Sequence, residues 1–189
     1  MQLYGVGGRV FRCLWMLEEV GAEYEQIPVD WSAGESRTAD FLALNPNGKV
    51  PLLVDGDLRL FESLAINYYL ARRYAPQLWA ANAAQEANAT QWLAWGMGEL
   101  EGPHDAANRS KTAIDLERFQ VSMDALRQIL AQQEFLLGQG FSVVDLNTAC
   151  LLLRPQYQAL ARDDATLGPW FERCVSRPAL AKVTAKPAT

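Results

Sequence analysis

The sequence holds little of the chemistry on which metal sites and covalent catalysis depend. Among its 189 residues there is one histidine, His104, so no site can use two histidine ligands. His104 directly follows Gly102-Pro103, and a solvated turn explains this position more simply than a Ser-His or Cys-His pair does. Histidine-dependent nucleophilic catalysis is therefore not predicted, and we expect no metal.

Cysteine is also scarce. The three cysteines, Cys13, Cys150 and Cys174, lie far apart and form no Cys-x-x-Cys motif. Each lies in an apolar stretch, so reduced thiols in the core of a cytoplasmic protein explain them better than a redox pair does. A dithiol of the protein itself is therefore not the expected working group.

Long apolar runs and excess positive charge are missing as well. No run approaches the ~18 residues that a membrane helix needs, and no basic stretch leads into an apolar segment near the N-terminus. The net charge of −5 disfavours a general nucleic-acid binder. We thus expect a cytoplasmic protein with no membrane partner and no nucleic-acid partner.

The first part of the chain alternates strand and helix patterns. One helix pattern stops at Gly21, and two apolar runs joined by Asp55-Gly56 predict a hairpin. The predicted segments are strand 1–4, helix 9–20, strand 24–29, helix 40–44, strand 50–54, strand 58–61 and helix 62–74. This βαβαββα order predicts an α/β domain over residues 1–76, with one parallel strand pair and an antiparallel hairpin.

From about residue 83 onward only helix patterns are present. One helix carries Trp92 and Trp95 on the same face and is expected to end at Gly102-Pro103. Ser142 and Asp145 have the spacing of a capping box at the start of a later helix. A further helix has apolar residues at the spacing of a bundle seam: Leu116, Phe119, Met123, Leu126 and Leu130. These patterns predict an all-helical domain over residues 83–189.

The most informative segment runs from Asn45 to Ile66. Pro51 begins a strand, where its missing N–H removes no ladder hydrogen bond. If the Val50-Pro51 bond is cis, the chain turns sharply there, and the Val50 N–H and C=O can face outward. An extended peptide ligand could then pair with Val50 as an added strand. A trans proline that merely starts the strand is the plainer alternative.

Glu62 and Ser63 open the helix that follows the hairpin. Backbone N–H groups and the Ser63 hydroxyl at a helix N-terminus can hold a carboxylate, and Glu62 can accept hydrogen bonds from an α-ammonium group. Taken singly, Ser63 is an ordinary N-cap and Glu62 a solvated charge. Together, however, they would bind an amino-acid zwitterion next to the Val50 N–H and C=O. We call these two main-chain groups of Val50 the clamp.

These motifs resemble those of the glutathione S-transferase family, in its bacterial, cytosolic form. The resemblance covers nearly the whole chain and is carried by LYG at 3–5, RCLWMLEEVG at 12–21, the segment 45–66, and FSVVDL at 141–146. It implies a thioredoxin-like domain over 1–76, followed by an all-helical domain that contributes the second-substrate site. It also implies a role in detoxification, with glutathione as co-substrate and no tightly bound cofactor.

The resemblance assigns roles within the glutathione site. Val50 would pair its backbone with the cysteinyl part of glutathione, and Pro51 would be the cis-proline. Glu62 and Ser63 would hold the γ-glutamyl end, while Lys49 would lie near the glycyl part.

Two further features follow from the same resemblance. Trp92 and Trp95 would form a wall of the second-substrate site between the domains, with core packing as the alternative. A homodimer is implied, formed through residues 67–74 and 86–99.

The group that activates the thiol is where this sequence departs from the family. The thiol of glutathione titrates at about pH 8.5, so an active site must favour the thiolate. Serine-type members place a hydroxyl where this chain has Gly8. The available substitutes are the backbone N–H groups of Gly8 and Arg9 at a helix start, the Arg9 guanidinium and the Tyr4 hydroxyl. Core packing for Tyr4 and a solvated position for Arg9 are the alternatives.

The predicted function is a glutathione transferase-like enzyme, in which the thiolate attacks an electrophilic carbon or the sulfur of a disulfide. Gly8 supports an alternative, a non-catalytic glutathione-binding or protein-interaction module of the same fold. Reduction of a disulfide or peroxide by two glutathiones is a third possibility. The sequence does not choose among electrophiles.

Overall fold

The computed structural model describes residues 1–112, 116–138 and 140–185, and these form two compact units. The first unit combines Met1–Pro76 with the chain's last helix, and the second is Gln77–Ser176. The last helix thus groups with the α/β unit, which the domain ranges expected from the sequence do not include. No helix among the described residues is long and apolar enough to cross a membrane.

The first unit follows the predicted order of strands and helices. Its elements are β1 (Gln2–Tyr4), α1 (Val10–Val20), β2 (Glu25–Ile27), the 3-10 helix η1 (Glu35–Arg37), α2 (Ala39–Leu44), β3 (Leu52–Asp55), β4 (Leu58–Phe61), α3 (Ser63–Tyr74) and α10 (Pro178–Ala185). The predicted hairpin is therefore confirmed as β3–β4, and the α/β expectation is confirmed for this unit.

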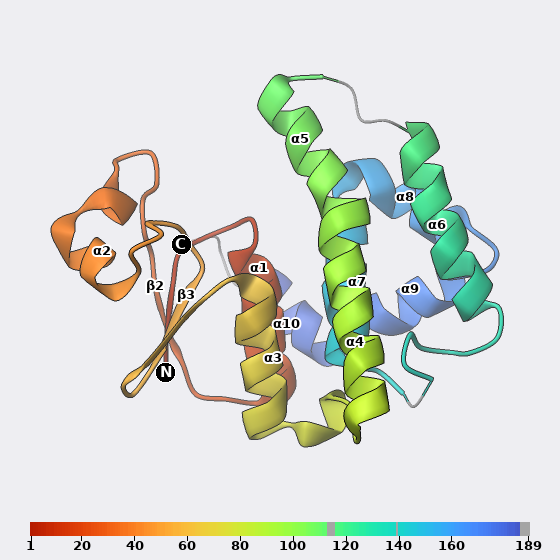
Figure 1. Cartoon of the computed structure of the whole chain (residues 1–189), viewed down its shortest axis with the longest axis horizontal. Coiled ribbons are helices and arrows are strands. Elements are labelled where there is room, and N and C mark those ends of the chain that lie inside the picture. The colour runs from red at the N-terminus through yellow and green to blue at the C-terminus, as the bar shows by residue number, and fades with distance from the viewer. Residues whose placement is uncertain (113–115, 139, 186–189) are drawn as a thin grey trace. The chain divides into compact units, whose positions relative to one another are not determined.

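A four-stranded sheet of order β2-β1-β3-β4 forms the centre of this unit. β1 pairs in parallel with β2 and antiparallel with β3, and β3 pairs antiparallel with β4. Helices α1 and α3 cover one face of the sheet, and α2 covers the other (Figure 1). Because side chains alternate along a strand, Leu53 points to the face of α1 and α3, while Leu52 packs with Phe41 of α2.

Helix α10 packs on α1 through a charged anchor. The Arg177 guanidinium donates to both carboxylate oxygens of Glu19, each at 2.7 Å, and the indole N–H of the fully buried Trp15 donates to the same carboxylate at 3.0 Å. Bidentate pairing of this kind fixes direction as well as distance. It ties the C-terminal helix to α1, and the start of α1 borders the candidate site.

The second unit is helical. Its elements are α4 (Ala83–Trp95), the π-helical segment η3 (Gly96–Glu101), α5 (Gly102–Ser110), α6 (Leu116–Leu130), α7 (Val143–Leu152), α8 (Pro155–Asp163) and α9 (Leu167–Val175), preceded by the 3-10 turn η2 (Pro76–Leu78). The predicted capping box is confirmed, because Ser142 and Asp145 bond to each other's backbone at the start of α7. The Asp145 carboxylate also accepts from the Trp170 indole and the Leu136 N–H, which explains how a fully buried carboxylate is tolerated.

Two expectations for this unit were wrong. The helix that carries Trp92 does not end at Gly102-Pro103, because the chain passes through the π-helical segment η3 and continues as α5. Pro103 is tolerated because it occupies the first turn of α5, where a missing N–H removes little. His104 is consequently a buried helix residue and not part of a solvated turn.

Candidate functional site

A tight turn held by Asn45 leads into the predicted clamp. The Asn45 side chain is fully buried, donates to the Lys49 carbonyl at 2.7 Å and accepts from the Asn47 N–H at 3.0 Å. Gly48 has a φ of 58°, and its N–H returns to the Asn45 carbonyl. One buried amide therefore fixes the backbone that presents Lys49 and Val50.

The Val50-Pro51 peptide bond is cis, as the sequence interpretation required. Strand β3 begins only at Leu52, so Val50 lies just outside the ladder. Within the part of the chain that the structure describes, the Val50 N–H and C=O form no hydrogen bond. They provide an unpaired donor and acceptor next to the end of a sheet, as an added-strand ligand needs.

Gly5 brings the end of β1 against this clamp. It has a φ of 114°, and a Cβ built on it would lie 2.6 Å from the Val50 Cβ and 2.9 Å from a Val10 methyl. Only glycine allows so close an approach. The loop between β1 and α1 therefore borders Val50.

The other predicted binding group lies at the start of α3. Glu62, at the N-cap, has a φ of 71°, which is unusual for a residue with a side chain. Ser63 is buried, yet among the described residues neither its hydroxyl nor the Glu62 carboxylate has a hydrogen-bond partner. The Cys13 thiol donates to the Ser63 carbonyl at 3.8 Å, which links this helix start to α1. Ser63 is thus not an N-cap in the ordinary sense, and its hydroxyl remains available to a ligand.

The loop before α1 is where the thiol-activating group is expected. Gly7 and Gly8 have φ values of 62° and 48°, and a Cβ on either would meet nothing within 4 Å. Arg9 is the half-buried N-cap of α1. In the described chain the Gly8 N–H donates to no protein acceptor. The position of the absent side chain is therefore open space beside a helix start.

Tyr4 lies on the sheet face covered by α2. Its ring packs edge-on against Phe41 with a centroid distance of 6.3 Å, and its hydroxyl donates to the Gln2 side chain at 3.2 Å. It also belongs to the apolar cluster formed around Val29 and Leu52. This placement supports the core role that the sequence analysis weighed against a catalytic one.

A cationic residue that was not predicted, Arg37, lies close to Gly48, two residues before Val50. Arg37, at the end of η1, places its guanidinium over Gly48, where a Cβ would meet it at 2.7 Å. Neither Arg37 nor Lys49 forms an ion pair with a described residue. The neighbouring Ser36 hydroxyl is buried without a hydrogen-bond partner. No spacing in the sequence brings residue 37 next to residue 48, so only the folded turn reveals this group.

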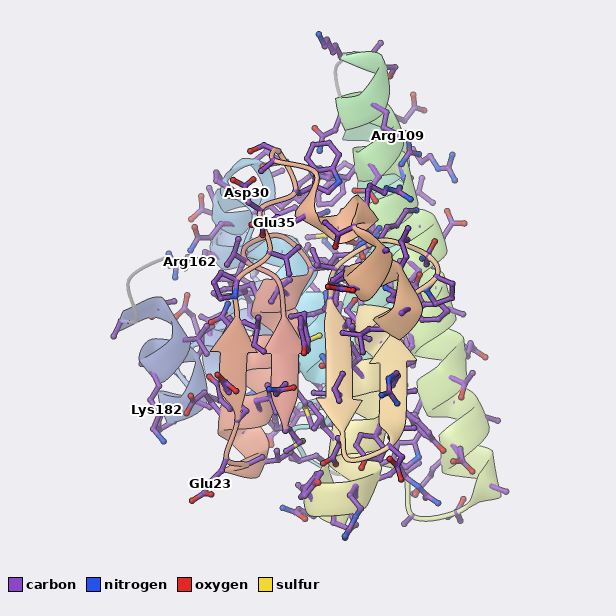
Figure 2. All side chains as sticks on the ribbon, turned by 90° about the vertical axis from the view of Figure 1, so that its left-hand side faces the viewer. Glu23, Asp30, Glu35, Arg109, Arg162 and Lys182 are labelled. Atoms are coloured by element: carbon purple, nitrogen blue, oxygen red, sulfur yellow. The ribbon has the colours of Figure 1, made fainter. Side chains whose placement is uncertain are left out.

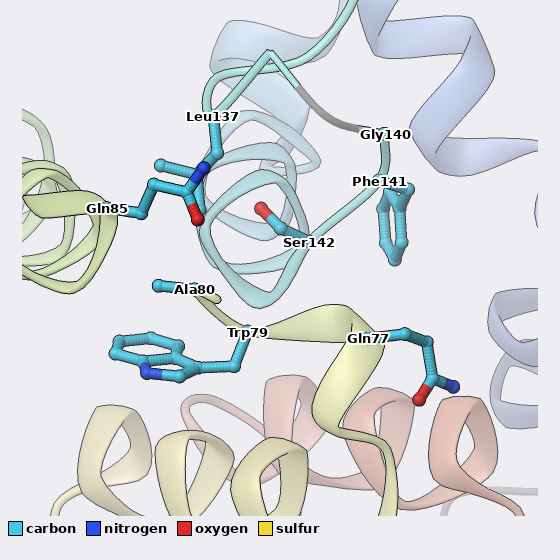
Figure 3. A pocket seen from close by; sticks show the side chains of 8 residues that line it. All are labelled: Gln77, Trp79, Ala80, Gln85, Leu137, Gly140, Phe141 and Ser142. Atoms are coloured by element: carbon cyan, nitrogen blue, oxygen red, sulfur yellow. The ribbon is translucent and has the colours of Figure 1, made fainter. Parts of the chain in front are cut away.

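In the second unit, Trp92 and Trp95 share a face of α4, as predicted. Their rings meet edge-to-face at 5.1 Å, with Trp92 buried and Trp95 half-buried. A small cavity of about 60 Å³ lies elsewhere in this unit, between Trp79, Gln85 and Ser142 (Figure 3). It holds little more than a few water molecules and is too small for a peptide ligand.

The single histidine lies in a polar contact network of the second unit. Its Nδ1 is 3.1 Å from the Tyr157 hydroxyl, and its Nε2 is 2.8 Å from the Asn108 amide. Tyr157 in turn stacks on Phe119 at 4.2 Å. Burial, followed by the nearby positive charge of Arg154, lowers the pKa of His104. The residue therefore connects α5 and α8 as a neutral imidazole.

Comparison with known proteins agrees with this geometry. A family model described as "Glutathione S-transferase, N-terminal domain" matches residues 1–72. Glutathione S-transferase 3 of Zea mays is 33% identical, with 98% of this chain and 93% of that protein covered. Glutathione S-transferase GstB of Escherichia coli strain K12 is 34% identical, with 95% and 94% covered. Among solved structures, glutathione S-transferase-I bound with lactoylglutathione superposes with a TM-score of 0.85 at 27% identity, with 97% and 98% covered.

Proposed function

This chain belongs to the glutathione S-transferase family. We propose which of its groups bind glutathione and which activate the thiol. The protein is a glutathione-dependent transferase, with glutathione as its co-substrate. The observation that carries the assignment of the site is the combination of a Val50 N–H and C=O that form no hydrogen bond with a Ser63 hydroxyl and a Glu62 carboxylate that also form none, in each case among the described residues.

The cysteinyl part of glutathione pairs with the Val50 N–H and C=O as a short antiparallel strand next to Pro51. The γ-glutamyl carboxylate accepts hydrogen bonds from the Ser63 hydroxyl and from the N–H groups that begin α3, where the helix dipole favours a negative charge. Glu62 accepts from the ammonium group at the same end. Each of these protein groups lacks another partner in the described chain, so glutathione displaces no existing protein hydrogen bond.

We place the glycyl carboxylate near Lys49, as the family resemblance implies, and Arg37 adds a second positive charge to that end. Arg37 comes from the end of η1, and its guanidinium lies against Gly48, the residue before Lys49. Because glutathione carries a carboxylate at each end, a cationic group at one end and a helix N-terminus at the other give complementary charge along its length.

The thiolate is stabilised by the backbone at the start of α1. The Gly8 N–H and the Arg9 N–H point from the positive end of an 11-residue helix, and the Arg9 guanidinium adds charge from the same loop. Tyr4 is the weaker candidate, because its hydroxyl already donates to Gln2. No covalent intermediate with the protein is required. Proximity and electrostatic stabilisation of the thiolate suffice.

The non-catalytic module is the less favoured alternative, since the relatives named above are transferases. Conjugation to a carbon electrophile is the leading reaction, and reduction of a disulfide or peroxide by two glutathiones uses the same thiolate. Calorimetric titration with glutathione, followed by its thiolate absorbance near neutral pH, tests the proposal. Binding with a thiolate signal and turnover of chlorodinitrobenzene are expected. Binding of glutathione with neither a thiolate signal nor turnover would instead support the non-catalytic module.

Three further assignments remain proposals. Trp92 and Trp95, which share a face of α4, are the groups that the helical unit would contribute to binding of the second substrate. A homodimer forms through residues 67–74 and 86–99. Its support is the exposure of two large aromatic residues, Phe61 on the edge strand β4 and Tyr68 on α3. Sedimentation velocity, which measures the mass of the particle in solution, tests it. A cytoplasmic location accords with three cysteines none of which forms a disulfide bond.

A further inference from the structure

The α/β unit has a hollow of its own, directly beside the proposed clamp at Val50. It has a volume of about 490 Å³, and Val50 is one of its lining residues, together with Val6 and the segment Pro28–Ser32. Ligand cavities commonly fall within about 300–1,000 Å³. Because the Val50 backbone is assigned to the cysteinyl part of glutathione, this hollow opens next to the place where the sulfur would lie.

Two apolar residues in the lining of this hollow, Val6 and Trp31, are exposed. The Trp31 side chain has 72% of its surface exposed and Val6 has 38%, whereas most large apolar residues of this unit are buried. Among the described residues, the Trp31 indole N–H makes no hydrogen bond. An exposed indole face beside an open hollow is a surface on which an aromatic ring can stack.

The loop that carries Trp31 is closed on itself by hydrogen bonds. The Glu35 carboxylate accepts from the Asp30 N–H at 2.7 Å, the Glu35 N–H donates to the Asp30 carbonyl at 3.1 Å, and the Gly34 N–H donates to the Trp31 carbonyl at 3.2 Å. Trp31 is therefore presented from a tight turn. Figure 2 shows Asp30 and Glu35 next to each other beyond the end of β2.

Asp30 places an unpaired negative charge on this wall. Its Oδ1 accepts from the Ser32 hydroxyl at 2.6 Å and from the Ala33 N–H at 3.0 Å. The hydrogen bond from Ser32, and then that from Ala33, lower the pKa of Asp30, so it is ionised at neutral pH. Neither Asp30 nor Glu35 pairs with a cation in the part of the chain that is described.

We propose that this hollow receives the electrophilic co-substrate, and that Trp31 and Asp30 make it select aromatic electrophiles that carry a positive charge over neutral and anionic ones of the same shape. The inference rests on the proposed function and adds a substrate class to it. A cation over the indole face gains a cation–π contact, and the Asp30 carboxylate adds an attractive charge at the rim. An anionic acceptor would meet repulsion at the same place.

The reaction on such an acceptor is a simple displacement. The glutathione thiol loses its proton to solvent, and the sulfur lone pair forms a carbon–sulfur bond at the benzylic carbon of the acceptor. The carbon–chlorine bond breaks, and chloride leaves with its electron pair. No oxidant, reductant or further reactant is needed.

Three para-substituted benzyl chlorides test the inference, and the cationic and neutral ones are matched in shape. The cationic probe is para-(chloromethyl)phenyl-trimethylammonium, its neutral isostere is para-tert-butylbenzyl chloride, and the anionic probe is para-(chloromethyl)benzoate. The measured quantity is the ratio of kcat/KM for the cation to kcat/KM for the isostere, each corrected for the reaction without enzyme. In Asp30→Asn this ratio should fall about fivefold, while kcat/KM for the anion rises.

Asn at position 30 keeps an oxygen acceptor for Ser32 and Ala33, so the turn is retained while the charge is lost. The matched control is Asp57→Asn, which removes the same charge from an exposed position in the β3–β4 turn and should leave the ratio unchanged. Trp31→Leu should lower kcat/KM for all three probes, and the ratio itself should fall by about threefold.

The outcomes separate this inference from the proposed function. An unchanged ratio in Asp30→Asn, with glutathione binding and turnover of the isostere intact, would overturn the charge selection alone. A large loss of glutathione affinity in Asp30→Asn would also overturn it, because the hollow would then belong to glutathione itself. A wild-type protein that neither binds glutathione nor converts the isostere would refute the proposed function, and the inference with it.

Discussion

The two ends of the proposed glutathione site are built in different ways. At the end formed by Val50, Glu62 and Ser63, the Val50 N–H and C=O and the two side chains at the start of α3 form no hydrogen bond with any described residue. At the thiol end, Gly8 leaves open space where a hydroxyl is expected. In the proposed site, glutathione binding and thiol activation therefore depend on separate groups, because the Val50 backbone groups are present while position 8 has no side chain. Variants at the two ends should therefore change affinity and rate independently.

The largest effect is expected where the loop before α1 meets the clamp. In Gly5→Ala, the new Cβ would lie 2.6 Å from the Val50 Cβ, so the clamp must shift. We expect a loss of about 2–4 kcal/mol in the free energy of unfolding, together with loss of glutathione binding. Urea denaturation and calorimetry measure the two quantities. Gly7→Ala is the control, since it also has positive φ but meets nothing within 4 Å. Equal costs in the two variants would contradict the close approach.

The binding end should respond next. Ser63→Ala removes a hydroxyl that pairs with a carboxylate in the proposal, so glutathione affinity should fall by about 1–3 kcal/mol. The thiolate fraction of bound glutathione should not change, because the Ser63 hydroxyl contacts the other end of the ligand. A titration that shows an unchanged dissociation constant would remove Ser63 from the site.

The next variant adds a hydroxyl at the thiol end of the site, where Gly8 has no side chain. Gly8→Ser places a hydroxyl in open space, and we expect kcat/KM with chlorodinitrobenzene to rise about tenfold, with little change in glutathione affinity. The positive φ should reduce the free energy of unfolding by about 1 kcal/mol. A rate that stays level would mean that the backbone and Arg9 already supply the full stabilisation of the thiolate.

The second unit offers a pH test that should leave the binding end untouched. Burial lowers the pKa of His104 from the ordinary 6.5, so the unfolded chain takes up the proton first as the pH falls. The stabilisation is complete above pH 6.5 and is lost progressively as the pH falls from there through the lowered folded pKa. Melting temperatures measured between neutral and mildly acidic pH should show this decline. The decline should be smaller in His104→Gln, which cannot take up a proton.

The smallest effect is expected at Tyr4. Tyr4→Phe keeps the ring packed on Phe41 and removes only the bond to Gln2, so kcat/KM should change by less than about twofold and stability by about 0.5–1 kcal/mol. A large fall in the thiolate signal would instead restore Tyr4 as the activating group.

The α/β unit could be predicted from the sequence with little error because its signals are local. The Asp55-Gly56 turn gave the hairpin, and Pro51 before a strand gave the possibility of a cis bond that the structure contains. The groups that were not predicted depend on contacts between distant residues. Arg37 over Gly48 and Gly5 against Val50 arise only when the chain has folded, and no periodicity marks them.

The errors in the helical unit come instead from a local signal that was misleading. Gly102-Pro103 is a strong local signal for a helix end, yet the helix continues because a π-helical segment precedes it and Pro103 falls in the first turn of α5. The prediction that His104 is solvated failed with it.

The Val50 clamp has a consequence for how this protein tolerates mutation. Main-chain atoms are common to every amino acid, so exchanging the residue-50 side chain leaves the donor and acceptor in place, within the space that Gly5 allows. Only proline at this position would delete the donor itself. A scan of alanine variants would therefore find residue 50 nearly silent, although it would carry the central contact with the ligand.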